Sequence, residues 1–284
     1  MPLQGLTLIG ESINDSVPST QTLFGANDLA GIMSLANVQD QLGAAYIDVN
    51  VGPRPPAFMA EVVRAVQTVT GKPLSIDSPD FATAKAGLEA YSPAHGTPIL
   101  NSISPMRMEM FDLLAVKPFR PILLVSENLK DGAGLLCLTA EETYAAAKLL
   151  LGTARRHGIA NKDCIFDPGI APLATDTENN LRRLMGALRL IRADPDFAGV
   201  HVSVGLSNFT VMLPSKRPDG SPVKAPLASA FLTRAMPLGL DTVIGSVKTP
   251  YAILPEGHPA LQCFDDCLAA EGFDVLERVQ NFYS

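Results

Sequence analysis

Short apolar runs that alternate with longer segments of helical periodicity are the feature that most limits how this chain can fold. Successive runs end 24 to 41 residues apart, which is the spacing of consecutive βα units. Eight such units in about 250 residues are typical of a (βα)8 barrel. We therefore predict a single-domain α/β fold, a (βα)8 TIM barrel spanning residues 1–284. Its strands are expected to end at Gly10, Asn50, Asp77, Asn101, Ser126, Asp167, Gly205 and Ser246.

The segments between these runs carry the start signals of helices. Ser78 and Pro79 fit the cap and first turn of a helix that follows the third strand. Thr139 and Glu142 stand in capping-box register at the start of a long amphipathic segment. Two connections are expected to be long loops, namely residues 11–26 after the first strand and residues 212–226 after the seventh. Long loops on the carboxyl face of a barrel are commonly functional.

Charge and cysteine usage limit the classes of partner and the compartment. The chain has 29 acidic and 22 basic residues, a net charge of −7, so it lacks the basic surface that nucleic acid or an anionic membrane requires. Its four dispersed cysteines favour a reducing cytoplasm over a disulfide framework, and Cys263 and Cys267 are expected to be buried thiols. No charged leader precedes an apolar segment, and no apolar run reaches about 18 residues. We expect a soluble cytoplasmic protein.

Carboxylates and amides dominate the positions where the predicted strands end. In a (βα)8 barrel these positions converge on one pocket. No histidine, cysteine or lysine clearly joins them, which argues against a zinc hydrolase and against a Schiff-base aldolase. A magnesium site made by Asp48, Asp77 and Asp167 remains an alternative, although the interleaved amides suit it less well. The strand-end residues are Glu11, Asn14, Asp48, Asn50, Asp77, Asn101, Glu127, Asn128, Asp167, Ser207, Asn208 and Ser246.

A neutral heterocycle with a hydrogen-bond donor edge suits such a pocket. A carboxylate accepts two N–H bonds side by side, and amides serve ring positions of either polarity, as the 2-amino-4-oxo edge of a pterin or guanine requires. Asp77 is the strongest candidate, because Ser78 already provides the helix cap. Asp167 has either a ligand role or a turn role before "PG", and Asp48 either binds a ligand or orients Asn50. Asn14, in turn, is either a ligand or the cap of a turn.

The strand-end motifs resemble those of one family, the pterin-binding methyltransferases that move a methyl group between N5 of tetrahydrofolate and the cobalt of a corrinoid protein. The same barrel occurs in dihydropteroate synthase. Each motif is short, but their order, spacing and position at strand ends make the set specific. The motifs are "GESIN" at 10–14, "DVNVG" at 48–52, "SIDS" at 75–78, "NSIS" at 101–104, "DPGI" at 167–170, "GLSN" at 205–208 and "GLD" at 239–241.

The resemblance implies roles for individual residues. Asp77, Asn101 and Asp167 would hold the pterin edge, and Asn208 would lie beside N5 as the principal catalytic group, together with Asp77. Two residues depart from the family pattern, because Ser12 replaces an arginine and Val211 replaces a glutamine that some relatives carry. The full set of expected pterin contacts is Glu11, Asn14, Asp48, Asn50, Asp77, Asn101, Asp167, Gly205, Ser207 and Asn208.

The resemblance also implies substrates and partners. Tetrahydrofolate or methyltetrahydrofolate would be the substrate, cobalamin would be carried by a partner corrinoid protein, no metal would be bound by the chain itself, and the chain would form a homodimer. Breaking the C–N bond requires the charge on N5 to be stabilised, and the Asn208 amide can do this by a hydrogen bond that tightens in the transition state. The basic, proline-rich loop 212–226 is expected to help dock the corrinoid protein.

Three other functions compete with this prediction. Dihydropteroate synthase shares the pocket, but that family places Ser-Arg-Lys after strand seven and Arg-x-His after strand eight, where this chain has "SNF" and "SVK". A non-catalytic folate-binding subunit would bind methyltetrahydrofolate without transferring the methyl group. A phosphate-dependent lyase is supported only by Gly245 and Ser246, which follow the last strand as in the phosphate sites of many barrels.

Overall fold

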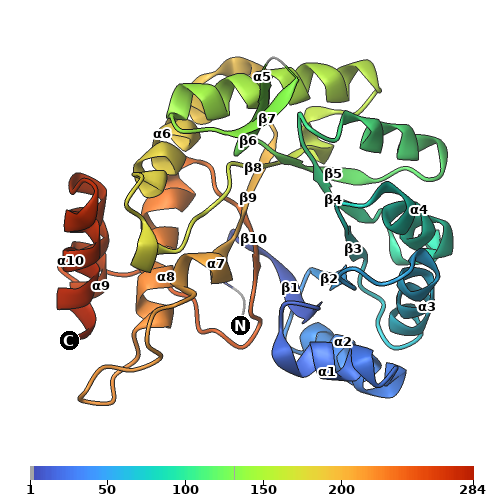
Figure 1. The fold of residues 1–284 in the computed structure, drawn as a ribbon, viewed down its shortest axis with the longest axis horizontal. Coiled ribbons are helices and arrows are strands. Elements are labelled where there is room, and N and C mark those ends of the chain that lie inside the picture. The colour runs from blue at the N-terminus through green and yellow to red at the C-terminus, as the bar shows by residue number, and fades with distance from the viewer. Residues whose placement is uncertain (1–2, 131) are drawn as a thin grey trace.

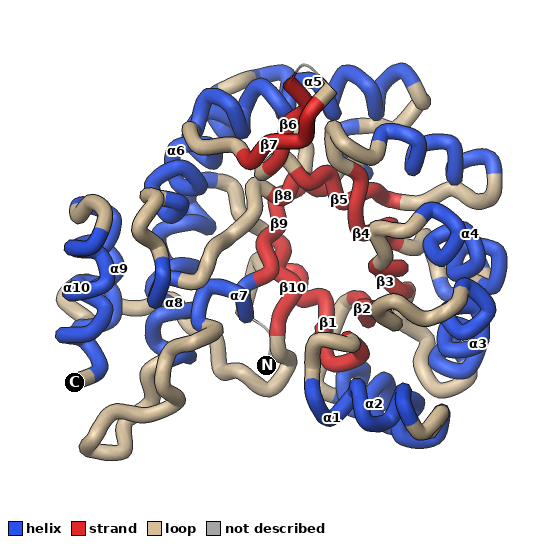
Figure 2. Tube along the Cα trace, viewed as in Figure 1, coloured by secondary structure: helices blue, strands red, loops and turns tan. Residues whose placement is uncertain are grey.

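Eight parallel strands close into a barrel, which confirms the predicted fold. The computed structural model of the protein describes residues 3–130 and 132–284. Around the barrel the strand order is β1-β10-β9-β8-β5-β4-β3-β2. Barrel strands that follow one another along the chain therefore pair side by side, and pairing of the first strand, β1, with the last, β10, closes the ring. Figure 2 shows this ring of strands end-on, surrounded by helices. The barrel strands are β1 (Thr7–Asn14), β2 (Tyr46–Asn50), β3 (Leu74–Asp77), β4 (Ile99–Ile103), β5 (Arg120–Leu124), β8 (Ile165–Asp167), β9 (His201–Gly205) and β10 (Thr242–Gly245).

Helices cover the outside of the barrel (Figure 1). The longest, α5, has the capping box expected from Thr139 and Glu142, with the Thr139 side chain accepting a hydrogen bond from the Glu142 backbone. Asp80, and not Ser78, is the residue that caps α4, because its side chain accepts from the backbone N–H of Thr83. The helices are α1 (Pro18–Gly25), α2 (Leu29–Gln41), α3 (Pro56–Gln67), α4 (Phe81–Ala90), α5 (Ala140–Arg156), α6 (Asn180–Ala193), α7 (Leu206–Thr210), α8 (Lys224–Ala235), α9 (Pro259–Ala269) and α10 (Phe273–Tyr283).

An isoleucine layer fills the interior of the barrel below its mouth. Ile9, Ile99, Ile122 and Ile165 are at most 1% exposed and form a separate apolar cluster, against which Ile244 packs. Every one of these residues comes from a different strand, as expected for the layered interior of a (βα)8 barrel. The layer closes the barrel, so the polar residues beyond it have an apolar floor.

The first strand is longer than predicted. β1 runs to Asn14 instead of ending at Gly10, and residues 18–25 form α1, so residues 11–26 are not the long loop that we expected. A bulge between Gly10 and Ile13 interrupts the ladder, which resumes with Asn14 opposite Asn50. Two buried side chains replace the missing ladder bonds at the Ser12 backbone. Oε1 of Gln39 accepts from the Ser12 N–H at 2.9 Å, and the Thr20 hydroxyl donates to the Ser12 carbonyl at 2.7 Å. The strand therefore continues beyond the bulge.

A small hairpin lies outside the barrel between β5 and α5. β5 ends at Leu124 and not at Ser126, and the hairpin consists of β6 (Glu127–Lys130) paired antiparallel with β7 (Ala133–Leu136). Antiparallel pairing of Glu127 with Leu136 draws the chain away from the barrel, so Glu127 and Asn128 do not stand at the end of a barrel strand as predicted. The fourth unit also differs from a regular βα unit, because a 3-10 helix, η2 (Met108–Ala115), follows β4.

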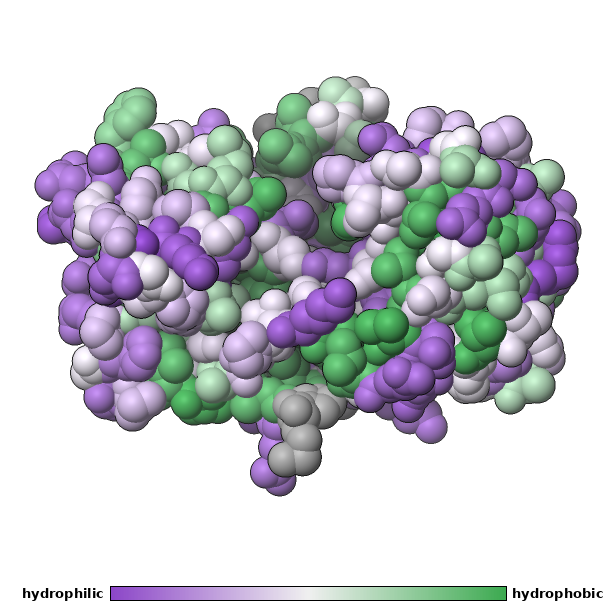
Figure 3. Space-filling view, turned by 90° about the horizontal axis from the view of Figure 1, so that it is seen from below, coloured by the Kyte–Doolittle hydropathy of each residue, from purple (hydrophilic) through white to green (hydrophobic). Residues whose placement is uncertain are grey.

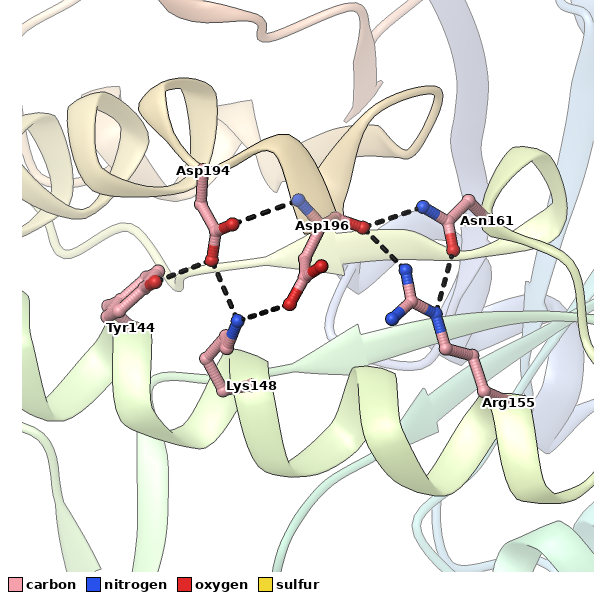
Figure 4. A network of polar contacts seen from close by, with 6 residues as sticks. All are labelled: Tyr144, Lys148, Arg155, Asn161, Asp194 and Asp196. Atoms are coloured by element: carbon pink, nitrogen blue, oxygen red, sulfur yellow. Dashed lines mark hydrogen bonds and ion pairs between the residues drawn. The ribbon is translucent and has the colours of Figure 1, made fainter.

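A polar network fastens α5 to the turn that precedes β9 (Figure 4). Asp194 accepts hydrogen bonds from the Tyr144 hydroxyl at 2.6 Å and from Lys148 Nζ at 2.9 Å. Lys148 also pairs with Asp196 at 2.7 Å. The network lies before a strand begins, on the face of the barrel that usually serves stability.

None of the helices in residues 3–130 and 132–284 is long and apolar enough to cross a membrane.

Candidate active site at the mouth of the barrel

The carboxyl ends of the strands surround a cavity of about 440 Å³. Figure 3 views the molecule from below Figure 1 and shows a hollow along its upper edge, between two lobes, with hydrophilic residues inside it. Ile244, which packs on the isoleucine layer, lines the cavity. Nine of the ten residues predicted from sequence as pterin contacts line it as well: Glu11, Asn14, Asp48, Asp77, Asn101, Asp167, Gly205, Ser207 and Asn208.

Asn50, the tenth predicted residue, is absent from the cavity wall and acts on a residue that lines it. Its Nδ2 donates to Oδ2 of Asp77 at 2.9 Å, and its Oδ1 accepts from the backbone N–H of Gly52 at 2.9 Å. The second bond fixes the rotation of the amide, so its N–H group must point toward Asp77. The predicted direct contact of Asn50 with a ligand is thus replaced by an indirect role, in which Asn50 orients the carboxylate.

Asp48, in the middle of β2, and Asp77, at the end of β3, form a pair of carboxyl groups. Asp48 is 1% exposed, and burial together with the charge of Asp77 raises the pKa of Asp48 well above its ordinary value. Burial also raises the pKa of Asp77 to about 6, although the Asn50 hydrogen bond and the charge of Arg107 oppose this. Two buried like charges repel, so the pair favours retaining one proton. We infer that Asp48 holds it when Asp77 is ionised.

One oxygen of Asp48 accepts no hydrogen bond from the described residues. Nδ2 of Asn101 lies 3.5 Å from Oδ1 of Asp48, whereas the buried Oδ2 has no N–H or O–H donor among these residues. The proton that Asp48 retains satisfies this oxygen, because a protonated Oδ2 can donate to the ionised Asp77 carboxylate. Asn101 stands opposite Asp77 in the β3–β4 register, so three polar side chains converge here.

Asp167 is held at the end of β8 by the turn that follows it. Its Oδ1 accepts from the backbone N–H of Gly169 at 2.8 Å, while burial raises its pKa to about 6. The buried guanidinium of Arg183 donates to the carbonyls of Pro168 at 2.7 Å and of Gly169 at 3.0 Å and so fixes the same turn. Asp167 therefore serves the turn and lines the cavity, and both alternatives considered from the sequence are compatible with its position.

The short helix α7 brings Ser207 and Asn208 to the mouth directly after β9. Ser207 donates a hydrogen bond to Oε1 of Glu11, and burial raises the pKa of Glu11. A Cβ atom at Gly205 would lie only 3.0 Å from Nδ2 of Asn208, so a glycine there leaves room for the amide to lie over the strand end. The Asn208 side chain has no hydrogen bond to another described side chain and remains available to a ligand.

Sequence reasoning missed one charged residue near the cavity. Arg107 lowers the pKa of Asp77 through its charge, and its Nη2 lies 3.5 Å from the Ser102 hydroxyl and 3.4 Å from Glu127. Arg107 precedes η2 and lies six residues beyond Asn101, so no position at a strand end indicated it. Its position depends on how the chain turns after β4.

Two alternatives lose support from the geometry. A Cβ atom at Gly245 would lie 2.7 Å from the Tyr251 hydroxyl, so a side chain already occupies the space where the phosphate of a lyase substrate would approach. In the described part of the chain, no three His, Cys, Asp or Glu side chains are grouped so that they could hold a metal ion. Asp48, Asp77 and Asp167 are accordingly not grouped as a site of three carboxylates.

Comparisons with known proteins agree with this geometry. A family model described as "pterin binding enzyme" matches residues 13–245. A relative from Eubacterium limosum, named methylcorrinoid:tetrahydrofolate methyltransferase, is 26% identical over 84% of each chain.

Solved structures of dihydropteroate synthases share the fold. The enzyme from Thermus thermophilus has a TM-score of 0.58 at 20% identity, covering 88% of this chain and 91% of the other. That from Xanthomonas albilineans with 4-aminobenzoic acid has a TM-score of 0.56 at 19% identity, covering 84% and 86%. The family match includes most of the strand-end residues around the cavity. This chain belongs to the pterin-binding enzyme family.

Proposed function

We propose that the protein is a methyltransferase that moves a methyl group between N5 of tetrahydrofolate and the cobalt of a corrinoid carried by a partner protein. The observation that carries the proposal is that Asn208 lines the same cavity as Asp77, Asn101 and Asp167. These are the groups that the strand-end motifs assigned to N5 and to the pterin edge. The printed name of the Eubacterium limosum relative supports the same reaction.

Binding of the pterin rests on the buried carboxylates. Ionised Asp77 and Asp167 each present oxygens that accept from the 2-amino group and ring N–H groups of the pterin. The hydrogen bond from Asn50 to Asp77 and the one from Gly169 to Asp167 hold both carboxylates in place before the ligand enters. A rigid acceptor loses little conformational entropy on binding, which favours affinity.

Asn208 acts at the nitrogen where the charge changes. When methyltetrahydrofolate is the donor, the methyl carbon bonds to cobalt through the electron pair of the reduced metal. The electron pair of the breaking C–N bond stays on N5, which takes up a proton. The amide of Asn208 hydrogen-bonds to N5 and stabilises this change, an effect of about 2–4 kcal/mol for one well-placed group. No nucleophile from the protein is needed, and the reverse reaction uses the same contacts.

Access to the mouth is the second requirement, because a corrinoid protein must approach N5. Ser215, Pro222 and Lys224 of the segment 212–226 line a space that adjoins the cavity at Ser207 and Val211. Part of the segment's basic charge is already used, since Arg217 stacks on Phe282 of α10 at 3.9 Å. This contact anchors the segment to α10, which packs on α9. We propose that the segment helps dock the corrinoid protein, that the chain works as a homodimer, and that it acts in the cytoplasm.

Dihydropteroate synthase activity receives less support from the structure. Phe209 occupies the position where that family was expected to place the lysine of its Ser-Arg-Lys sequence. Its ring is 1% exposed and packs against Phe231 and Phe264, at centroid distances of 5.4 and 6.2 Å. The residue therefore points into the core and supplies no cation to a diphosphate.

A spectroscopic assay tests the proposed function. Purified protein is mixed with tetrahydrofolate and methylcob(III)alamin, and the cobalamin absorbance is followed. We expect methylcobalamin to be consumed in proportion to protein concentration, with 5-methyltetrahydrofolate as product. An unchanged spectrum, with tetrahydrofolate bound, indicates a non-catalytic folate-binding subunit. Formation of dihydropteroate from 4-aminobenzoate and the pterin diphosphate indicates the synthase.

A further inference from the structure

A second cavity, of about 460 Å³, adjoins the pterin cavity on the side of α7 and α8. Ser207 of α7 and Val211, the residue after this helix, line both cavities, so the two spaces meet along α7. Neither the family match nor the motifs of the sequence assign a role to the second cavity. Its position makes it accessible to a substituent that extends from a ligand bound at the mouth.

The charged residues of the second cavity are two lysines. Lys224 and Lys248 both line it, and no Asp or Glu belongs to its wall as far as the structure describes the chain. Within residues 3–130 and 132–284, neither lysine forms an ion pair, whereas Lys148 on α5 pairs with two carboxylates. In a chain with a net charge of −7, this is a locally positive region. Such a region attracts anions.

The start of α8 adds hydrogen-bond donors to the same wall. Lys224 is the first residue of this 12-residue helix, Val223 provides no side-chain cap, and no acidic residue occupies the first turn. Lys224 and Ala225 line the cavity, and their two backbone N–H groups are the free donors of the first turn, because Pro226 has no N–H and the N–H of Leu227 bonds to Val223 O. An anion placed there would satisfy donors that the protein leaves open.

Thr210 gives independent evidence that the wall is built for a polar ligand. Its side chain is only 8% exposed and lines the second cavity. Its hydroxyl donates to no group among the described residues, although Thr20 and Thr143, which are similarly buried, both bond to backbone carbonyls. The residue is buried but its hydroxyl reaches the cavity surface, so an unbonded hydroxyl on a fixed side chain faces the space where a ligand acceptor would lie.

We propose that the second cavity is an anion subsite that binds the carboxylates of the glutamate tail of the folate whose pterin ring occupies the first cavity. The proposal rests on the proposed function, and it identifies the substrate form that this protein prefers, namely a folate with several glutamates. Lys224, Lys248 and the first turn of α8 bind the carboxylates, and the Thr210 hydroxyl donates a further hydrogen bond.

The composition of the wall favours a tail over a free diphosphate. Apolar groups, including Val211, Pro222 and Ala228, line the second cavity together with the lysines. An aminobenzoyl ring can pack against them, whereas a diphosphate would gain nothing from this surface. Lys248 is exposed and belongs to the outer part of the wall, so successive carboxylates along a tail can meet successive cations.

Binding measurements on the full-length protein without any corrinoid test the proposal. The three ligands are 5-methyltetrahydrofolate with one glutamate, the same compound with three glutamates, and a 5-methyltetrahydropterin that carries a methyl group at C6 in place of the tail. We expect the triglutamate to bind more tightly than the monoglutamate, and this advantage to shrink as salt is raised, because partly exposed charges are screened.

The variants are Lys224→Gln and Lys248→Gln, with Lys85→Gln as the matched control. Each cavity variant should reduce the ratio of triglutamate to tail-less affinity about threefold to fivefold, and the double variant on the order of tenfold. Lys85 lies on α4 beside Glu89, at 3.8 Å, and its variant removes the same charge without changing either affinity. Thr210→Val, which keeps the shape of the side chain, should lower the same ratio.

Separate outcomes distinguish the subsite from the proposed function. If the tail-less pterin binds and the ratio is the same in wild type and in the double variant, the subsite is rejected while the proposed function stands. If inorganic pyrophosphate binds only when both lysines are present and the tail adds no affinity, the cavity is a diphosphate site and the proposal is overturned. If no pterin binds, both are wrong.

Discussion

The side-chain amide of Asn50 donates a hydrogen bond of 2.9 Å to Oδ2 of Asp77 and thereby joins the ends of β2 and β3. The bond stabilises the ionised form of a carboxyl group whose pKa is raised by burial to about 6. Asp77 itself lines the cavity and can accept from a ligand there. Asn50 thus prepares the acceptor without lining the cavity.

Asn50→Ala should weaken pterin binding by roughly 1.5–3 kcal/mol, because a hydrogen bond to a charged group is lost. The pKa of Asp77 should rise further, since one of the interactions that lower it is gone. Isothermal titration with tetrahydrofolate at several pH values measures both effects. Asn50→Asp adds a like charge and should weaken binding more than Asn50→Ala does. Equal affinity of wild type and Asn50→Ala would show that the bond has no role in binding.

The affinity for the pterin should depend on pH near 6. Burial raises the pKa of both Asp77 and Asp167 to about 6, and both must be ionised to accept the pterin N–H groups. Affinity is therefore expected to be full above pH 7 and to fall as the pH drops through 6, by about tenfold per pH unit for each group that must lose a proton. Asp77→Asn should remove one of the two steps. A flat profile between pH 5 and 7 would contradict this assignment.

Asn208→Ala should lower the rate of methyl transfer by about 10²–10³ while changing the folate dissociation constant much less. The reason is that the amide interacts most strongly with N5 in the transition state. Single-turnover kinetics with methylcob(III)alamin and tetrahydrofolate separate the rate from binding. Asn208→Gln, which keeps the amide but shifts it, serves as the control for loss of volume. A normal rate of methyl transfer in Asn208→Ala would contradict the mechanism.

Gly10 and Gln39 should be energetically coupled. A Cβ atom at Gly10 would lie 2.5 Å from Oε1 of Gln39, the atom that accepts the backbone N–H of Ser12 in the bulge. Gly10→Ala is expected to cost about 1–3 kcal/mol of unfolding free energy through overpacking. Gln39→Ala also destabilises, because the bulge loses its acceptor, but it makes room for the added methyl group. Urea unfolding measures the loss of unfolding free energy in both single variants and in the double variant. The loss in the double variant should be smaller than the sum of the two single losses, and strict additivity would refute the coupling.

The network around Asp194 should contribute stability that disappears in acid. Hydrogen bonds from Tyr144 and Lys148 lower the pKa of Asp194 to about 2 from its ordinary value of 3.8. A carboxyl group with a lowered pKa stabilises the fold above its unfolded pKa, and this contribution is lost as pH falls from about 4 to about 2. Tyr144→Phe should therefore lower the urea midpoint at pH 6 and have progressively less effect below pH 4. The same loss at pH 2 and pH 6 would be inconsistent with this role.

Parts of the fold and of the site were predictable because they depend on local patterns. Strand ends such as Asp77, Asp167 and Gly205 were located to the residue, since an apolar run followed by a turn or cap residue marks them. The convergence of the strand-end groups was predictable too, because a closed parallel barrel brings all its carboxyl ends to one face. Whether these groups bind a pterin stays a prediction.

Other features depended on contacts between distant parts of the chain. β1 continued to Asn14 because Gln39 and Thr20, from other elements, satisfy the bulge. Glu127 left the barrel because it pairs with Leu136 across a hairpin, and Arg107 came near Asp77 only through the turn after β4. No periodicity in the sequence reports such pairings.

The sequence by itself determined the barrel and the chemical types at its mouth, because apolar periodicity and strand-end residues are local properties. The tertiary structure decided which acceptors are free. Asn50 turns toward Asp77, and Oδ2 of Asp48 has no donor among the residues that the structure describes. Lys224 and Lys248 line the same cavity beside α7, although they are 24 positions apart in the sequence. The physical reason is that hydrogen bonding and burial depend on neighbours in space, and closure of the barrel sets those neighbours.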